Sequence, residues 1–215
     1  MNGDQPVEVP ATPGAPEVEP AVDGRTARAT KTRDAIADAM LDLLAEGHLR
    51  PTAKEIAERA GVSVRSVYVH FDDLEDLFCV AANRHFARIA PMLTPVPATG
   101  PLRERAHALV RQRVRLYAKV GAIGRATRLN AEFSPTLARI LRDVRAQSQS
   151  DLERVFAQEL CTFDDRGRAN ALAILEVLTG PGAWQTLREN HNLDVDIAIQ
   201  CVADTIVVQL EAARR

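Results

Sequence analysis

Residues 63–70 of the chain read SVRSVYVH and place several hydrogen-bond donors within one short stretch. The donor-bearing side chains are Ser63, Arg65, Ser66, Tyr68 and His70. Hydroxyl, guanidinium and imidazole groups of this kind can donate to bases, phosphates and carbonyl oxygens. The valines between them recur every two or three residues, and together with the tyrosine they are also typical of a β-strand. The flanking residues therefore have to decide between the edge of a sheet and a helix.

Helix-start and helix-stop signals precede this stretch. Thr52 and Glu55 have the spacing of a capping box, which predicts a helix that starts at Thr52. Gly61 is a favourable residue for the end of that helix. Ser63 can cap a second helix two residues later. The pattern thus predicts two short helices joined by a turn that contains glycine, which is a helix-turn-helix.

The second helix also explains the valines. Val64, Val67 and Phe71 recur at helical spacing and are expected to form a buried stripe. The donor-bearing side chains then lie on the opposite face, and a helix of this width fits the major groove of DNA. Asp72 and Glu75 repeat the capping-box spacing, so a third helix is expected to begin at once.

The stretch from Thr52 to Phe71 resembles the DNA-binding domain of TetR-family transcriptional regulators. It follows the pattern T-x-x-x-I-A-x-x-A-G-V-S-x-x-x-V-Y-x-H-F and is preceded by an amphipathic segment, residues 32–46, that predicts the first helix. Beyond this region the chain resembles the family only in the number, order and length of its expected helices. The resemblance implies an all-α fold, with a three-helix DNA-binding domain followed by a helical domain for ligand binding and dimerisation.

The resemblance also implies which residues contact a double-stranded DNA operator. They are expected to be Thr52, Lys54, Ser63, Val64, Arg65, Ser66, Tyr68 and His70. Arg65 can read guanine through two hydrogen bonds, which is worth about 1–3 kcal/mol of discrimination. Val64 can offer only an apolar contact and also fits the buried stripe, and Tyr68 has packing within the domain as its alternative role.

One departure from the family pattern concerns the start of the third helix. The family often has a phosphate-binding lysine there, whereas this chain has Leu74 among acidic residues. The acids are Asp72, Asp73, Glu75 and Asp76. Positive charge is instead expected from residues before the motif, with Lys31 as a predicted DNA contact beside Arg25, Arg28 and Arg33. This basic segment could reach phosphates or the minor groove, or it could be a solvated linker.

The composition is ordinary for a globular protein, with 46% hydrophobic residues and a net charge of −2 over 215 residues. Residues 1–24 carry five acids and five prolines without Lys or Arg, so we expect a disordered acidic tail. The chain shows no signal peptide, no membrane-length apolar run and no metal-ligand spacing among its three cysteines. We therefore expect a cytoplasmic protein that needs no metal or cofactor and makes no membrane contact.

Residues 25–91 are interpreted as the DNA-binding domain and residues 92–215 as the effector-binding and dimerisation domain. In the latter, residues 101–120, 135–160, 168–178 and 194–213 are expected to be helical. The last two of these are apolar around most of their circumference, which favours a homodimer that pairs them with their copies. A buried central helix in a monomer is the alternative.

Arg113 falls inside the apolar stripe of the helix expected over 101–120, and a buried cation needs a partner. That partner is either an anionic group of an effector or an internal one, for which Glu132 and Asp143 are candidates; an outward-reaching side chain is a third possibility. The full set of expected pocket residues is Phe78, Phe86, Arg113, Leu116, Tyr117, Asn130, Phe133, Leu175 and Trp184. Each of the apolar ones could equally be plain core.

Together these features predict a sequence-specific DNA-binding transcriptional regulator. The resemblance implies a homodimeric repressor that a small organic effector, anionic or apolar, releases from a palindromic operator. The sequence offers no catalytic constellation, so an enzyme is not expected. The alternative is a helical protein-interaction module without specific DNA binding.

Overall fold

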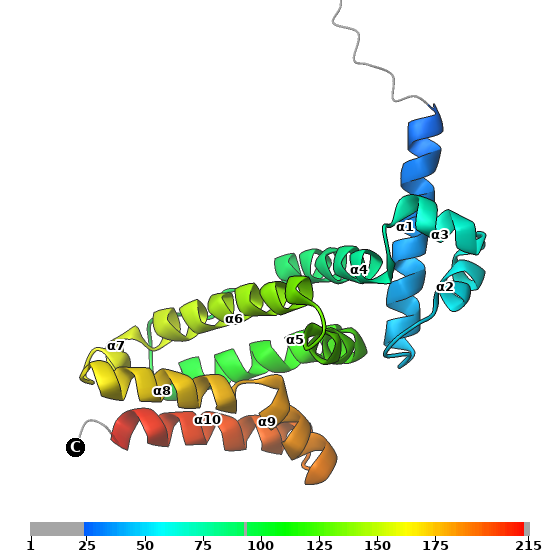
Figure 1. The fold of residues 1–215 in the computed structure, drawn as a ribbon. Helices are drawn as coiled ribbons and strands as arrows, with labels where there is room; N and C mark the ends of the chain where they lie inside the picture. Colours follow the sequence, from blue (N-terminus) through cyan, green and yellow to red (C-terminus); the bar gives the residue numbers. More distant parts are fainter. Residues whose placement is uncertain (1–23, 93, 213–215) are drawn as a thin grey trace, which may run out of the picture.

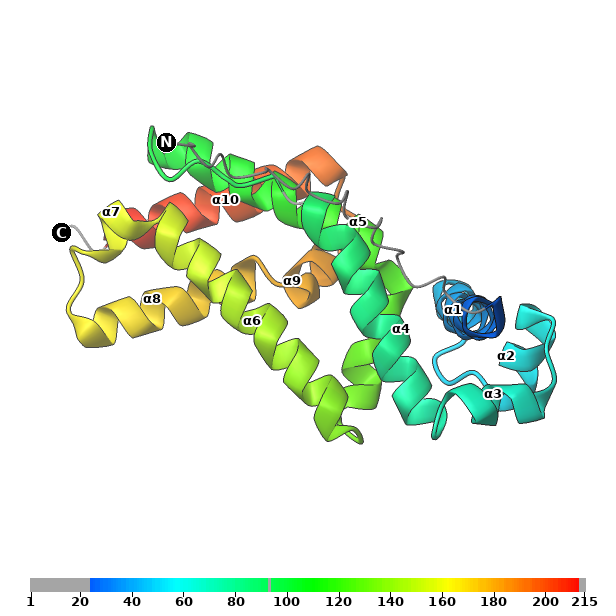
Figure 2. The ribbon, with the colours of Figure 1, turned by 90° about the horizontal axis from the view of Figure 1, so that it is seen from above.

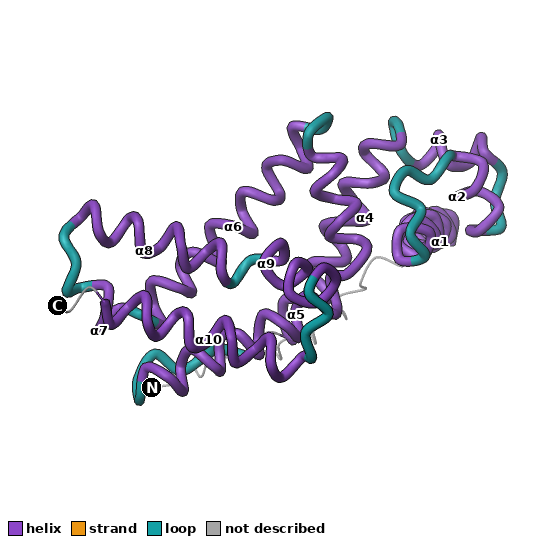
Figure 3. The backbone as a smooth tube through the Cα atoms, turned by 90° about the horizontal axis from the view of Figure 1, so that it is seen from below, coloured by secondary structure: helices purple, strands orange, loops and turns teal. Residues whose placement is uncertain are grey.

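The computed structural model describes residues 24–92 and 94–212, and all regular structure within these ranges is helical (Figure 3). The first half comprises α1 (Gly24–Ala45), α2 (Ala53–Ala60), α3 (Val64–His70), α4 (Leu74–Ile89) and a 3-10 turn (Ala90–Met92). The second half comprises α5 (Leu102–Ala131), α6 (Pro135–Val155), α7 (Ala157–Leu160), α8 (Asp165–Leu178), α9 (Pro181–Gln185), a π-helical turn (Thr186–Asn190) and α10 (Val195–Ala212). The predicted all-α class is confirmed. The expected acidic tail lies outside the described residues, apart from Gly24.

Two groups of helices give the molecule its elongated shape (Figure 1). Helices α1, α2 and α3 pack together at one end, and α5 to α10 form the other group. Helix α4 leaves the first group and runs back along α5 and α6, so these three helices connect the two ends (Figure 2).

Helix α1 is longer than the sequence pattern predicts, because it begins at Gly24 rather than near residue 32. The added turns have no apolar stripe, but their side chains bond within the helix. The Arg28 guanidinium Nε donates to the carbonyl oxygen of Gly24 at 3.1 Å, and the Thr30 hydroxyl donates to the carbonyl of Thr26 at 3.0 Å. The described part of the basic segment before the motif is therefore helix, and neither an extended arm nor an irregular linker.

The residues pack into two separate apolar clusters. The first lies under α1 to α4 and includes Ile123 and Ala126 from the end of α5, and Leu137 and Ile140 from the start of α6. It therefore extends past residue 91, where the sequence pattern suggests a domain boundary. The second cluster joins the first part of α5 and the end of α6 to α7, α8 and α10.

Helix α5 belongs to both clusters because its backbone breaks at Gly121. That residue has φ 40° and ψ −128°, a conformation that only glycine adopts without strain. The sequence pattern ends this helix at residue 120, whereas the structure continues it to Ala131 beyond the break. The break re-aims the second part of α5 toward the first cluster.

The second group of helices is held by a buried ion pair that the sequence pattern does not reveal. The Arg105 guanidinium Nη2 donates to Glu159 Oε1 at 2.6 Å, and both side chains are almost fully buried. Arg105 also donates to the backbone carbonyl of Gly100 at 3.0 Å. A buried pair that is satisfied in this way fixes geometry, because separating the partners would leave an uncompensated charge.

We expect Gly121→Ala to lower the free energy of unfolding by about 1–3 kcal/mol, since alanine is strained at a positive φ. Chemical unfolding at a fixed protein concentration measures this loss. Gly182→Ala is the matched control, because an added Cβ there meets no atom within 4 Å and φ is not positive; it should be neutral or gain up to about 1 kcal/mol. Equal stabilities of the two variants would contradict the strain argument.

Candidate nucleic-acid interface

Helix α2 begins and ends as the sequence predicts. The Thr52 hydroxyl accepts from the Glu55 amide at 3.3 Å, while the Thr52 amide donates to Glu55 Oε2 at 2.7 Å, which completes the capping box. Gly61 adopts the left-handed conformation with φ 68° and donates its amide to the last carbonyls of the helix. This turn aims the chain directly into α3.

Helix α3 is short and rests on few buried side chains. Ser63 caps it by accepting from the Ser66 amide at 3.1 Å, as predicted. Val67 is fully buried and Phe71, the residue after the helix, is nearly so. The predicted buried stripe is wrong at Val64, which is 40% exposed, because the first residue of the helix lies beyond the edge of the core.

Arg33 of α1 holds the far end of α3. Its guanidinium Nη1 donates to the backbone carbonyl of His70, the last residue of the helix, and its carbon Cζ lies 4.3 Å from the centre of the Phe71 ring. Arg33 therefore supports α3 from behind instead of extending toward phosphate. The sequence pattern misses this role, because residues 33 and 70 are distant along the chain.

The outer face of α3 presents Val64, Arg65 and Tyr68 to solvent. Tyr68 is 51% exposed, so its ring is not committed to packing within the domain. The neighbouring Val69 is 71% exposed and adds apolar surface beside these side chains. By contrast, Ser66 and His70 are half-buried at the margin of this face.

Four other predicted DNA contacts lie off the outer face of α3. Thr52 and Lys54 occupy the start of α2, where both are exposed and the Lys54 ammonium lies 3.9 Å from Glu58. Lys31 is exposed on the projecting turns of α1. Ser63 is exposed, but its hydroxyl oxygen is already used as the helix cap.

The acidic start of α4 differs from the prediction in one residue and has structural uses. Asp73, not Asp72, caps the helix, and its carboxylate accepts from the Asp76 amide at 2.7 Å. Glu75 accepts from the Ser134 hydroxyl at 2.6 Å and thereby connects α4 to the cap of α6. These carboxylates stabilise the positive end of the helix dipole.

The residues predicted to line an effector pocket do not all come together. Arg113, Tyr117 and Trp184 surround one small cavity, and Leu116 lies half-buried on the same helix without lining it. Leu175 is buried in the second cluster. Phe78 is buried in the first cluster, and Phe86 packs against it.

Two further pocket predictions fall at the junction of α5 and α6. Asn130 donates from Nδ2 to the backbone carbonyl of Leu49 at 3.1 Å, so it joins the end of α5 to the turn before α2. Phe133 is 70% exposed and lies against the Arg50 guanidinium, 4.8 Å from its ring centre. Neither lines the cavity, because the break at Gly121 turns this part of α5 toward the first cluster.

Arg113 is buried, as the apolar stripe implies, and its acidic partner is neither Glu132 nor Asp143. Asp151 of α6 lies nearest, with 3.7 Å between the Arg113 Nη2 and the carboxylate. The three acids lie on different turns, and only the observed packing of α6 on α5 selects among them.

Several other groups can be assigned structural roles. Burial raises the pKa of the Cys79 thiol, which is consistent with a buried and unreactive cysteine. Within the described residues, no cluster of three or more His, Cys, Asp or Glu side chains is arranged to hold a metal ion. None of the described helices is long and apolar enough to span a membrane.

This arrangement matches a known domain. Residues 36–79 fit the family model described as bacterial regulatory proteins, tetR family. The chain carries a TetR-family domain. The TetR-family match covers α2, α3 and their connecting turn completely, together with parts of α1 and α4.

Solved structures share the fold of this chain over most of its length. A transcriptional regulator from Rhodococcus sp. Rha1 is 21% identical, with a TM-score of 0.67 over 84% of this chain and 96% of that one. A TetR transcription regulator from Haloarcula marismortui is 16% identical, with a TM-score of 0.59 over 85% and 98%. The multidrug binding protein EbrR, solved with imidazole, is 20% identical, with a TM-score of 0.54 over 80% and 93%. Comparison with curated proteins gives no match.

We expect Arg33→Met to loosen α3 and to lower the free energy of unfolding by about 1–3 kcal/mol, because a charge-assisted hydrogen bond and a cation–π contact are lost. Faster amide exchange in residues 64–71, followed by mass spectrometry, measures the loosening. Arg28→Met is the matched control, since the Arg28 guanidinium bonds to its own helix. Unchanged exchange in Arg33→Met would show that α3 does not depend on this contact.

Proposed function

We propose that the chain is a sequence-specific DNA-binding transcriptional regulator that acts as a homodimer, with residues 25–91 as its DNA-binding domain and residues 92–215 for effector binding and dimerisation. In this proposal it represses from a palindromic operator until a small organic effector releases it. The observation that carries the proposal is the outer face of α3, where a capped and supported helix exposes Val64, Arg65 and Tyr68. The TetR-family domain match supports the same function.

Arg65 is the side chain of this face that can discriminate between bases. Its guanidinium can donate two hydrogen bonds to guanine in the major groove, while Val64 and Val69 offer apolar contact to a thymine methyl group. The exposed Lys54, Lys31 and Thr52 would then fix the position of the domain through phosphate contacts. A protein-interaction module is the second candidate, because the exposed Tyr68 and Val69 also suit a protein partner.

A homodimer is supported by apolar side chains that α8 and α10 leave exposed. The two helices pack side by side (Figure 1) and carry Ile174, Val177, Ile197 and Val208 on their solvent-facing sides, with 40% to 70% exposure. Exposed apolar side chains on two neighbouring helices favour association with a second copy. Two copies would present two α3 helices to the half-sites of a palindrome.

The contacts between the two groups of helices offer a path from effector to DNA. The junction of α5 and α6 touches α4 through Ser134 and Glu75. The last turn of α5 and the residues after it touch the segment before α2 through Asn130 and Phe133. A ligand that shifts α5 or α6 would move these contacts and change the spacing of the two α3 helices. The coupling free energy needed for such release is typically about 1–3 kcal/mol. The likeness to EbrR supports a small-molecule effector.

We expect Arg65→Ala to weaken binding to the specific site by about 1–3 kcal/mol and to leave binding to unrelated duplexes nearly unchanged. Fluorescence anisotropy on duplexes from the flanks of its own gene, over a range of salt concentrations, measures both. Arg166→Ala removes an exposed arginine of α8 and serves as the control. If wild type binds none of these duplexes more tightly than a random one, a protein-interaction module becomes the better-supported function.

We expect Val177→Asp to convert the homodimer to a monomer, since an unpaired charge buried at the interface costs about 3–5 kcal/mol. Sedimentation equilibrium measures the association state. Val144→Asp, at an exposed valine of α6, should leave the dimer intact. A chain that is monomeric before any substitution, or a Val177→Asp variant that stays dimeric, would contradict this placement of the interface.

A further inference from the structure

A small cavity lies between α5, α10 and the segment that follows α8. Its volume is about 10 Å³, and its polar lining is formed by Arg113, Tyr117 and Thr179. The apolar side is formed by Val110, Val114 and Trp184. Ligand pockets are usually about 300–1,000 Å³, so a ligand could enter only if part of the wall moves.

One wall of this cavity is weakly attached. The segment from Pro181 to Asn190, here called the cover, consists of α9 and the π-helical turn and contains no fully buried residue. Gly180 precedes the cover, Gly182 lies near its start and Asn192, with φ 48°, follows it. Trp184 and Leu187 are its half-buried contacts with the second cluster. Segments with few buried contacts open at low free-energy cost, and π-helical turns are frequent at functional sites.

Arg113 is poorly satisfied for a buried cation. Only 7% of its side chain is exposed, and its Nε has no hydrogen-bond partner. Its Nη2 donates to the backbone carbonyl of Ser148 at 3.3 Å, a long bond. The Asp151 carboxylate lies 3.7 Å away, beyond ordinary hydrogen-bond distance, and also lies 3.6 Å from Arg154. A guanidinium has five N–H donors in a fork that matches a carboxylate, so much of its capacity is unused.

We propose that this cavity is the binding site of a small organic carboxylate with an apolar body, which pairs with Arg113 in place of Asp151 while the cover closes over it. Asp151 is 25% exposed and already has Arg154 beside it, so it can give up Arg113 without losing all compensation. The role of this ligand as the effector of a regulator rests on the proposed function, whereas its binding to the cavity does not.

The other walls suit such a ligand. The apolar body would lie against Val110, Val114 and the Trp184 ring, where burial of apolar surface adds affinity. Burial raises the pKa of Tyr117 to about 12, so its hydroxyl stays protonated and can donate. In the present arrangement that hydroxyl donates to the backbone carbonyl of Thr179, next to the cover. A ligand oxygen could take over this bond as the cover moves.

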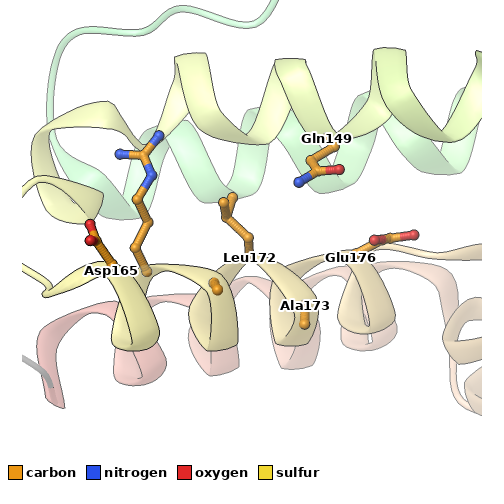
Figure 4. Close-up of a pocket in the computed structure, with 7 residues that line it drawn as sticks. Gln149, Asp165, Leu172, Ala173 and Glu176 are labelled. Carbon is orange, nitrogen blue, oxygen red and sulfur yellow. The ribbon is translucent and has the colours of Figure 1, made fainter.

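A larger hollow elsewhere fits this ligand less well. A groove of about 290 Å³ runs between α6 and α8, with Leu172 of α8 pointing toward α6 (Figure 4). Its charged side chains already have partners: Arg168 lies 3.9 Å from Glu153, and Glu176 accepts from Arg145. The groove is wide open to solvent, and its Arg168 is 41% exposed, so an anion there would remain largely hydrated.

Trp184 is the single tryptophan of the sequence and lines the cavity, so its fluorescence reports on occupancy directly. The full-length protein without DNA is titrated with benzoate and octanoate, and with benzamide as the uncharged match of benzoate. We expect a saturable change with at least one carboxylate, and benzamide weaker than benzoate by roughly tenfold to a hundredfold, the usual worth of a hydrogen bond to a charged group. Absence of saturation with both carboxylates up to millimolar concentration, or equal binding of benzamide, would overturn the proposal.

Two variants assign the site to its residues. Arg113→Met should lose the preference for benzoate over benzamide, whereas Arg111→Met, at an exposed position of the same helix, should keep it. Asp151→Asn should bind benzoate several-fold more tightly, because the competing carboxylate is gone, and this variant retains Arg113 in case Arg113→Met does not fold. If Asp151→Asn binds benzoate no better than wild type, Arg113 and Asp151 form only an internal ion pair, and the proposed carboxylate site is wrong.

A separate titration keeps this inference apart from the proposed function. Operator binding is measured by anisotropy with and without saturating carboxylate. Weaker operator binding in wild type but not in Arg113→Met would make the carboxylate an effector of the regulator. A protein that binds carboxylate but no operator would leave the site standing and reject the regulatory role.

Discussion

A seven-residue helix makes too few backbone hydrogen bonds to persist in water by itself, so the position of α3 depends on what touches it. Three kinds of support are present: the Ser63 cap at one end, Val67 beneath the middle, and Arg33 with Phe71 at the other end. Because the inner side of the helix is committed to these contacts, its outer side is left for recognition. Two longer helices complete this arrangement: α1 packs behind α3, and α4 leads the chain away from it.

The parts of this site that sequence reasoning reaches are those set by neighbouring residues. Thr52 with Glu55, Gly61 and Ser63 lie within a few positions of their partners, so helix starts and stops follow from local chemistry. The brace from Arg33 to His70 joins residues far apart in the chain, and no local pattern marks it. The same holds for Arg105 and Glu159, whose pairing depends on how α5 meets α7.

The second half of the chain shows where periodicity stops being informative. Apolar spacing predicts α5, α6, α8 and α10, but it ends α5 at the Gly121 break. It does not detect α9, because no side chain of that helix is fully buried. Periodicity also places Arg113 inside an apolar stripe but suggests Glu132 or Asp143 as its partner, because only the packing of α6 on α5 brings Asp151 near it. The expected pocket residues also divide between two clusters, because Phe78 and Phe86 lie on α4 in the first cluster, whereas Leu175 and Trp184 belong to the second.

The carboxylates at the start of α4 have a consequence for how a regulator of this kind would search a genome. They follow the last residue of α3 closely, in a chain whose net charge is −2. Attraction to phosphate is independent of sequence and supplies nearly all of a protein's residence on random DNA. Negative charge beside the recognition helix reduces that residence at every site alike, while base contacts are kept. Such a protein would spend less time sliding along DNA and more time diffusing between segments, while the ratio of operator binding to background binding would stay the same, because base contacts set that ratio.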